Sequence, residues 1–114
     1  TVMAVPLHAS KLRQRGFNQA QVLVDGIREV WPLMDPGREL LRVVHTRTQT
    51  KKGRLERWAN VEQAFRLAHP DALRDRHVLL VDDVVTTGAT IEACAVALSV
   101  VPGLRISIFT CACA

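Results

Sequence analysis

The sequence predicts an α/β fold with an open, mainly parallel sheet flanked by helices. The apolar run over 77–84 (HVLLVDDV) is typical of a strand that is covered on both faces. A helical pattern over 90–101 and a further apolar strand over 104–114 follow it. A strand, a helix and a second strand at this spacing form a parallel crossover unit, and this unit predicts the α/β class.

The first third of the chain predicts one strand and one helix. A short apolar strand is expected over 2–7, and residues 8–16 are polar, basic and end in glycine, so we expect a loop there. Asn18 is typical of a helix N-cap, and the pattern after it predicts a helix over 19–31 that Pro32 ends. The apolar face expected for this helix consists of Val22, Leu23, Ile27 and Val30.

The middle of the chain gives weaker signals. Residues 35–37 (DPG) predict a turn, and residues 39–44 (ELLRVV) predict a strand with imperfect alternation. Residues 45–58 contain few apolar side chains, and such a long connection in a compact domain is typical of a functional lid or of disorder. A short extended piece is expected over 61–65, and a further turn begins at Pro70.

The positive charge of the chain is concentrated in this middle part. The net charge is +4, and residues 42–57 carry six basic side chains and one acidic side chain. The rest of the sequence is therefore close to neutral. A basic segment of this kind suits a polyanionic partner, either a nucleic acid or a phosphorylated small molecule. On charge alone, a solvated basic loop fits equally well.

Length and composition predict a single domain over residues 1–114, located in the cytoplasm. No apolar run is long enough for a membrane-spanning helix, and no signal peptide is visible. The three cysteines form no C-x-x-C pair, which argues against a disulfide framework and a zinc cluster. The sequence opens directly on a strand, and a sheet with so few strands has open edges. We therefore expect a fragment of a longer protein, or a chain that pairs with a second copy as a homodimer.

Two aspartates and a run of small residues lie at the end of the strand over 77–84, where open α/β sheets bind ligands. Backbone N–H groups of a glycine-containing turn and of the first turn of a helix form a cradle for phosphate. The residues expected to bind phosphate in this way are Thr86, Thr87, Gly88, Ala89 and Thr90. Carboxylates accept hydrogen bonds from sugar hydroxyls, so Asp82 and Asp83 could bind the ribose of the same ligand. The segment therefore predicts a site for a ribose 5-phosphate.

The stretch VLLVDDVVTTGAT, residues 78–90, resembles the phosphoribosyl-pyrophosphate (PRPP) motif of type I phosphoribosyltransferases without a gap. The resemblance implies a Rossmann-like sheet, PRPP as the substrate and Mg²⁺ as the cofactor. The Mg²⁺ would be bound mostly by ligand oxygens and water, with Asp82 and Asp83 as the available protein ligands. Two other phosphate-related folds fit less well. A receiver domain needs a further aspartate and a lysine, which are absent after Asp83, and a P-loop needs a Gly-Lys-Ser/Thr sequence that is also absent.

Two further segments resemble the competence-protein branch of this family, the ComF/GntX branch. They are VPLHASKLRQRGFNQAQVL (5–23) and RTQTKKGRLERWANVEQAF (47–65). In such proteins a cysteine-rich zinc module usually precedes this domain, which implies that the chain is the C-terminal part of a longer protein. The branch also implies a link to DNA uptake, with DNA or the uptake machinery as a partner.

The resemblance further implies a role for each group of residues. A nitrogenous base, which the sequence does not identify, would attack C1 of PRPP and displace pyrophosphate. The pyrophosphate loop would consist of Leu7, His8, Ala9 and Ser10, with Arg13 and Arg15 close behind. The residues implied in catalysis are Asp82, Asp83, Lys51, Lys52 and Arg54, the last three on a lid that closes over the reacting centre. Hypoxanthine-type members carry an aspartate where this sequence has Thr86, so a 6-oxopurine acceptor is disfavoured.

Two other functions stay open on the sequence. The same phosphate cradle could serve a non-catalytic module that senses PRPP or a nucleotide. Alternatively, the basic segment over 42–57 could bind nucleic acid, although the scarcity of aromatic residues for base stacking disfavours this function.

Overall fold

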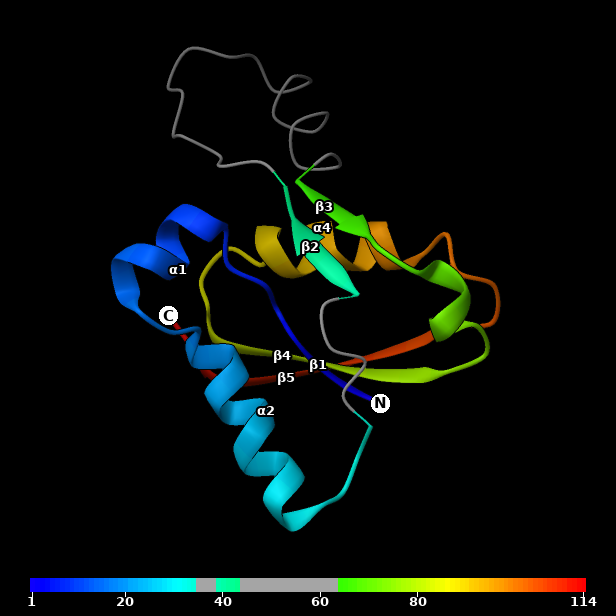
Figure 1. Ribbon diagram of the computed structural model, residues 1–114, viewed down its shortest axis with the longest axis horizontal. Coiled ribbons are helices and arrows are strands. Elements are labelled where there is room, and N and C mark those ends of the chain that lie inside the picture. Colours follow the sequence, from blue (N-terminus) through cyan, green and yellow to red (C-terminus); the bar gives the residue numbers. More distant parts are fainter. Residues whose placement is uncertain (35–38, 44–63) are drawn as a thin grey trace.

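The computed structural model describes residues 1–34, 39–43 and 64–114, and it has an α/β architecture (Figure 1). Within these residues, a parallel sheet has the strand order β1–β4–β5 and consists of β1 (Val2–Ala4), β4 (His77–Val85) and β5 (Arg105–Cys113). A separate antiparallel hairpin pairs β2 (Leu40–Arg42) with β3 (Phe65–Leu67). The parallel sheet and its helices confirm the predicted fold class.

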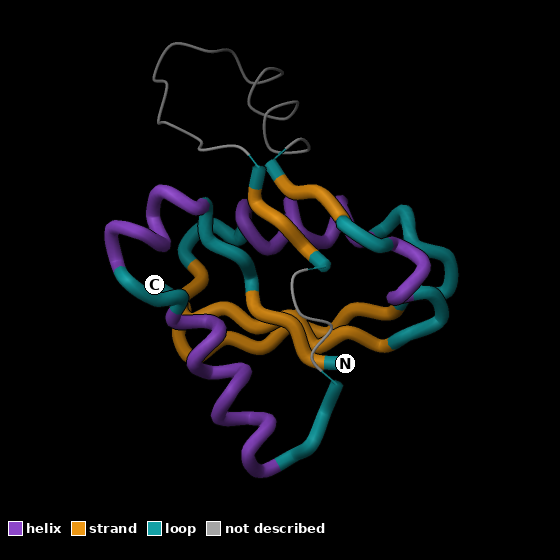
Figure 2. Tube along the Cα trace, in the orientation of Figure 1, coloured by secondary structure: helices purple, strands orange, loops and turns teal. Residues whose placement is uncertain are grey.

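Helices lie on both sides of the parallel sheet, as Figure 2 shows. One face is covered by α2 (Gln19–Val30), and the other face lies under α4 (Ala89–Leu98) and the β2–β3 hairpin. The short helix α1 (Ala9–Arg15) follows β1, and a 3₁₀ helix (Pro70–Leu73) precedes β4. None of the helices in the described ranges combines the length and the apolar character needed to cross a bilayer.

The alternation of side chains along the strands gives the sheet two apolar faces. On the α2 face, Val2 and Val81 are fully buried against Val24. The core on the α4 face contains Met3, Val78, Leu80, Cys94 and Leu98, together with Leu40 and Phe65 of the hairpin. Burying one Val or Leu side chain fully contributes about 1.5–3 kcal/mol. Because both of its faces are covered, β4 can be a continuous apolar run, as the sequence predicted.

The helix α1 corrects the prediction of a loop over 8–16. At its start, the Nδ1 atom of His8 accepts a hydrogen bond from the backbone N–H of Ser10 at 3.2 Å. At its end, Gly16 adopts a left-handed conformation (φ 82°), and its N–H donates to the carbonyl of Leu12 at 2.8 Å. No residue of α1 is buried, so this helix has no apolar face that a sequence pattern could reveal.

The helix α2 confirms the predicted helix and its Asn18 cap, but its buried face differs from the prediction. Ala20 and Val24 are buried, whereas Val22 and Val30 are 56% and 89% exposed. Val22 lies two positions from Val24 and therefore about 200° around the helix axis from it. The other two predicted residues do pack against the sheet.

The other predicted elements are present with somewhat different bounds. The strands expected over 2–7 and 39–44 correspond to β1 and β2, and the helix expected over 90–101 corresponds to α4. The strand expected over 104–114 corresponds to β5. The predicted turn at 35–37, the loop over 45–58 and residues 61–63 lie outside the described residues.

The strand β5 forms an edge of the sheet as far as the described residues extend, because it pairs with β4 alone. Two of its large apolar side chains, Ile108 and Phe109, are 53% and 42% exposed. The open edge that the sequence predicted is therefore present on this side, and pairing with a second copy stays a prediction.

Candidate functional site

The connections that follow β1 and β4 lie at the same end of the sheet. These two strands are parallel neighbours, with Val2 opposite Leu79 and Ala4 opposite Val81. Beyond the paired residues, the N–H of Val5 still donates to the carbonyl of Val81 at 2.8 Å. Figure 1 shows α1 and the connection between β4 and α4 on this same side of the molecule. The structure therefore brings the segment predicted to bind pyrophosphate to the edge that also carries the predicted phosphate turn.

The turn between β4 and α4 leaves the start of α4 without a side-chain cap. Its N-cap is Gly88, which has a positive φ of 82°, a conformation that glycine adopts at little cost. The carbonyl of Gly88 accepts the first helical bond from Glu92 at 2.9 Å. Near the helix start, the Ala89 N–H donates a long hydrogen bond of 3.4 Å to Thr87 Oγ1. The free N–H groups of the first turn carry partial positive charge, so this helix start suits an anion.

A small hollow of about 40 Å³ lies against this turn. It is lined by Asp82, Val84, Val85, Thr86, Thr87, Gly88, Ala89, Thr90 and Ile91. All five predicted phosphate-binding residues therefore line one concavity together with Asp82. Asp83 is not among the lining residues, so the structure brings one of the two aspartates to the hollow. A ligand as large as a sugar phosphate would extend out of a hollow of this size.

The two aspartates are held by the backbone of their own strand. The N–H of Asp83 donates to Asp82 Oδ1 at 2.9 Å, and the N–H of Val84 donates to Asp83 Oδ1 at 2.8 Å. Burial raises the pKa of the Asp82 carboxyl above its ordinary value, and the neighbouring Asp83 carboxyl raises it further. The N–H of Asp83 and the positive charge of Arg42 act in the opposite direction. Asp82 is thus a partly desolvated acceptor whose charge is influenced by a cation on another element.

Arg42 is a residue near the site that the sequence reasoning did not single out. It lies on β2, and its charge acts on Asp82 of β4 and on Cys94 of α4. Burial raises the pKa of the Cys94 thiol to about 12, and the charge of Asp82 adds to this increase. In the sequence, Arg42 was counted only as one of several basic residues. The imperfect alternation over 39–44 could have identified Arg42, because it places an arginine where an apolar side chain is expected.

The predicted pyrophosphate loop is mostly the start of α1. His8 caps the helix through Nδ1, and the Ser10 hydroxyl lies 2.9 Å from the same atom. Leu7 is half-buried and Ala9 is exposed. The side chains of Arg13 and Arg15 are also exposed. These cations are therefore accessible to an anionic ligand, and His8 and Ser10 already serve the local structure.

Asn18 connects this segment to the sheet. Its Oδ1 accepts from the Ala20 N–H at 3.0 Å and so caps α2, while its Nδ2 donates to the carbonyl of Val5 at 3.0 Å. One side chain thus fixes the start of α2 to the end of β1. The predicted lid residues Lys51, Lys52 and Arg54 lie outside the described residues.

The donor set near the turn limits how a metal ion could bind. In the described part of the chain, no group of three or more His, Cys, Asp or Glu side chains could hold a metal ion. Asp82 and Asp83 offer carboxylate oxygens, which Mg²⁺ prefers, and Mg²⁺ commonly keeps several waters and binds substrate phosphates. These residues fit Mg²⁺ that arrives with a phosphorylated ligand.

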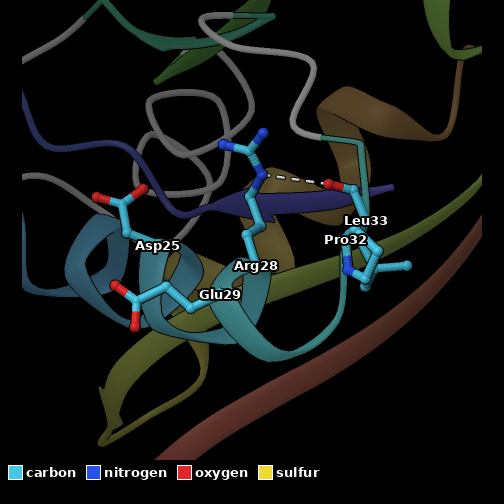
Figure 3. Close-up of a pocket in the computed structure, with 5 residues that line it drawn as sticks. All are labelled: Asp25, Arg28, Glu29, Pro32 and Leu33. Atoms are coloured by element: carbon cyan, nitrogen blue, oxygen red, sulfur yellow. Dashed lines mark hydrogen bonds between the residues drawn. The ribbon is translucent and has the colours of Figure 1, made fainter.

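A larger hollow of about 320 Å³ lies away from this edge, at the end of α2 (Figure 3). It is lined by Asp25, Arg28, Glu29, Pro32 and Leu33, none of which was predicted to bind a ligand. The Nε atom of Arg28 donates to the carbonyl of Leu33 at 3.1 Å, as the dashed line in Figure 3 marks. This hollow is open and charged, and its arginine ties the chain after α2 to the helix.

The fold and the turn together describe an α/β protein in which a helix without a side-chain cap starts at the carboxyl edge of a parallel sheet. The chain is 35% identical over 92 residues to "Competence protein F" of Haemophilus influenzae. The aligned region covers 80% of this chain and 40% of that protein. The chain is 34% identical over 90 residues to "DNA utilization protein YhgH" of Escherichia coli and of Salmonella typhimurium. The chain is therefore similar in sequence to proteins with these two names over about four fifths of its own length.

The chain spans about two fifths of the length of these curated relatives. No protein-family model and no solved structure matches the chain.

Proposed function

We propose that the chain binds PRPP or a ribose 5-phosphate nucleotide at the turn over 86–90, together with Mg²⁺, and transfers the phosphoribosyl group to a nitrogenous acceptor. The observation that carries this proposal is the hollow that Asp82 shares with the uncapped start of α4. A carboxylate acceptor and a group of free N–H donors in one place match a ligand with hydroxyls at one end and a phosphate at the other.

In this proposal each element has a defined task. The N–H groups of the turn and of the first turn of α4 bind the 5-phosphate, and the Thr86 and Thr87 hydroxyls add hydrogen bonds. Asp82 accepts a hydrogen bond from a ribose hydroxyl through the oxygen that does not receive the Asp83 N–H. Asp82 would be the protein carboxylate at the hollow that could hold Mg²⁺, and the bound ion would supply positive charge to the leaving pyrophosphate.

The proposed reaction is a substitution at C1 of the ribose. The bond between C1 and the pyrophosphate oxygen breaks, a bond from the acceptor nitrogen to C1 forms, and the nitrogen loses its proton to solvent. Negative charge develops on the leaving pyrophosphate, so nearby cations stabilise the transition state. Arg13 and Arg15 on α1, at the same edge of the sheet, together with Lys51, Lys52 and Arg54, are the residues we propose for this task.

The names of the relatives support a link to DNA uptake for the whole protein. We propose that the chain acts in connection with the use of incoming DNA, through its ligand or through its reaction product. A non-catalytic PRPP sensor is the second candidate, because the hollow accommodates a phosphate more readily than a phosphate, a ribose and a base together.

Binding is tested by calorimetric titration of ribose 5-phosphate and of PRPP into the protein with Mg²⁺. We expect Asp82→Asn to weaken binding by about tenfold, which corresponds to the loss of one charge-assisted hydrogen bond. Glu92→Gln is the matched control, because it removes an exposed carboxylate of α4 that does not line the hollow. Equal affinity of the Asp82→Asn variant and the wild-type protein would contradict the proposed site.

Turnover is tested separately, by measuring pyrophosphate release from PRPP with a panel of adenine, uracil, orotate and 6-oxopurine acceptors. Release with one acceptor supports the transferase, and binding without release with any acceptor supports the sensor. A nucleic-acid binder would instead bind DNA with an affinity that falls steeply with salt and that survives the loss of both aspartates.

A further inference from the structure

One charged residue lies on the inward side of the β2–β3 hairpin. Leu40 and Phe65 are buried in the core on the α4 face, whereas Leu41 and Arg66 are exposed. Because side chains alternate along a strand, Arg42 lies on the same side of β2 as Leu40. The hairpin therefore carries an apolar side chain outward and an arginine inward.

The arginine is held in this position by its neighbour across the hairpin. Arg42 pairs directly with Phe65 in the antiparallel register, and its Cζ atom lies 5.5 Å from the centre of the Phe65 ring. A guanidinium at this distance over a ring face is attracted by the π electrons. Phe65 is itself 6% exposed and belongs to the same core as Cys94 and Leu80. The ring is thus a fixed support for the cation.

Asp82 lies on the side of β4 that faces the hairpin. Side chains alternate along the strand, so Asp82 is on the same face as Val78 and Leu80, which share a core cluster with Phe65. The positive charge of Arg42, supported by Phe65, lowers the pKa of Asp82. A charged group on an inward face is costly unless an opposite charge compensates it. The groups that act on Asp82 are the Asp83 carboxylate and N–H beside it and Arg42, and Cys94 adds no charge because its thiol stays protonated. Among the described residues, Arg42 is therefore the cation that partly offsets the cost of the Asp82 charge.

We propose that Arg42 is a positioning residue of the candidate site: supported by Phe65, it balances the charge of Asp82 and orients that carboxylate toward the hollow. The proposal rests on the proposed function only for the consequence that Asp82 contacts the ligand. Arg42 does not itself touch the ligand in this proposal. It acts through Asp82, so its contribution to binding disappears when Asp82 no longer carries a charge.

The first test is a double-mutant cycle on folding, which requires no ligand. The equilibrium constants of unfolding are measured for the wild-type protein, Arg42→Gln, Asp82→Asn and the double variant. We expect the two substitutions to be non-additive by at least threefold. Arg66→Gln is the matched control, because this arginine lies on the outward side of the same hairpin, and its effect should be additive with that of Asp82→Asn. Additivity of Arg42→Gln with Asp82→Asn would overturn the proposal.

The second test applies the same cycle to the affinity for ribose 5-phosphate with Mg²⁺. Arg42→Gln should weaken binding by about threefold to tenfold in the wild-type background and leave it unchanged in the Asp82→Asn background. A loss of the same size in both backgrounds would overturn the proposal and would show that Arg42 contacts the ligand directly. Arg42→Lys keeps the charge and should restore at least half of the lost binding free energy. If Arg42→Gln does not fold, Phe65→Leu, which removes the support of the cation, provides the cycle with Asp82→Asn.

The two tests separate the possible failures. Non-additive folding together with no binding of ribose 5-phosphate or PRPP by the wild-type protein would leave Arg42 as the partner of Asp82 and would refute the proposed function. Additive folding together with measurable ligand binding would refute the role of Arg42 alone.

Discussion

The two connections at the carboxyl edge of the sheet start their helices in different ways. After β1, His8 caps α1 by accepting from the Ser10 N–H, and Asn18 caps α2 by accepting from the Ala20 N–H. After β4, Gly88 starts α4 with no side-chain cap. Both connections lie at one edge and both follow a parallel strand. They differ in whether a side chain caps the helix that follows.

This difference in capping distinguishes a connection whose side chains stabilise the fold from one that suits a ligand. Each helix start after β1 has one backbone N–H group satisfied by its own capping side chain. The helix start after β4 has no side-chain cap and only the long 3.4 Å bond from the Ala89 N–H to Thr87 Oγ1, and a hollow lies beside it. An acceptor side chain at position 88 would occupy the place that we assign to the ligand.

The largest expected effect comes from placing a negative charge at this helix start. Gly88→Asp should weaken the binding of ribose 5-phosphate by about thirtyfold, equivalent to about 2 kcal/mol, because the new carboxylate repels the phosphate. Gly88→Asn is the control: it has the same size, tolerates a positive φ and carries no charge. Calorimetric titration of both variants measures the difference. If they bind equally, charge at this turn is irrelevant and the phosphate lies elsewhere.

The second largest effect is expected at Asn18, whose side chain makes two hydrogen bonds. Asn18→Ala should lower the free energy of unfolding by about 1.5 kcal/mol, because it loses both the cap of α2 and the bond to the Val5 carbonyl. Asn18→Ser keeps a capping oxygen and should recover most of the loss. Denaturant unfolding measures both variants. Stability unchanged by the alanine substitution would show that this connection is not fixed by its cap.

A smaller effect is expected at His8. Replacing it with alanine should destabilise α1 by about 1 kcal/mol, because the Ser10 N–H loses its acceptor. Since α1 contains no buried residue, we expect the change to be local, with faster amide exchange at Ser10 and no change at Ala20. His8→Asn provides a capping oxygen and serves as the control. Uniformly faster exchange throughout the protein would contradict this local role.

The smallest effect concerns Asp82. Its pKa is raised in the folded protein, so its charged form favours the unfolded chain, and the carboxylate costs stability above the folded pKa. Asp82→Asn keeps the Oδ1 acceptor for the Asp83 N–H and should stabilise the protein at neutral pH by less than about 1 kcal/mol. The gain should shrink as the pH falls through the folded pKa. If the variant is less stable than the wild-type protein at pH 7, the Asp82 carboxylate stabilises the fold, which contradicts the prediction.

The elements around β4 were predictable because their signals are local. A continuous apolar run marks a strand that is covered on both faces, and the turn residues after it mark the start of α4. The cap of α2 was predictable for the same reason, since Asn18 directly precedes the helix. In contrast, α1 was missed because a seven-residue polar helix without buried side chains leaves no periodic pattern.

The composition of the candidate site was only partly predictable. The five turn residues and Asp82 are consecutive or nearly so, and the fold brings them to one hollow. The separation of Asp83 from this hollow depends on side-chain alternation within a strand that extends to Val85, beyond the predicted end at 84. The position of Arg42 depends on the register of a hairpin whose strands are far apart in sequence, which no local pattern specifies.

The reactivity of Cys94 can report on the opening of α4, the helix of the candidate site. Its thiol is fully buried and stays protonated, so a thiol reagent can modify it only when α4 separates from the sheet. With the exposed Cys111 and Cys113 replaced by serine, the rate of alkylation would give the free energy of that opening. A ligand that bridges β4 and the first turn of α4 would slow alkylation in proportion to its occupancy, so a single chemical label could rank ligands without an assay of turnover.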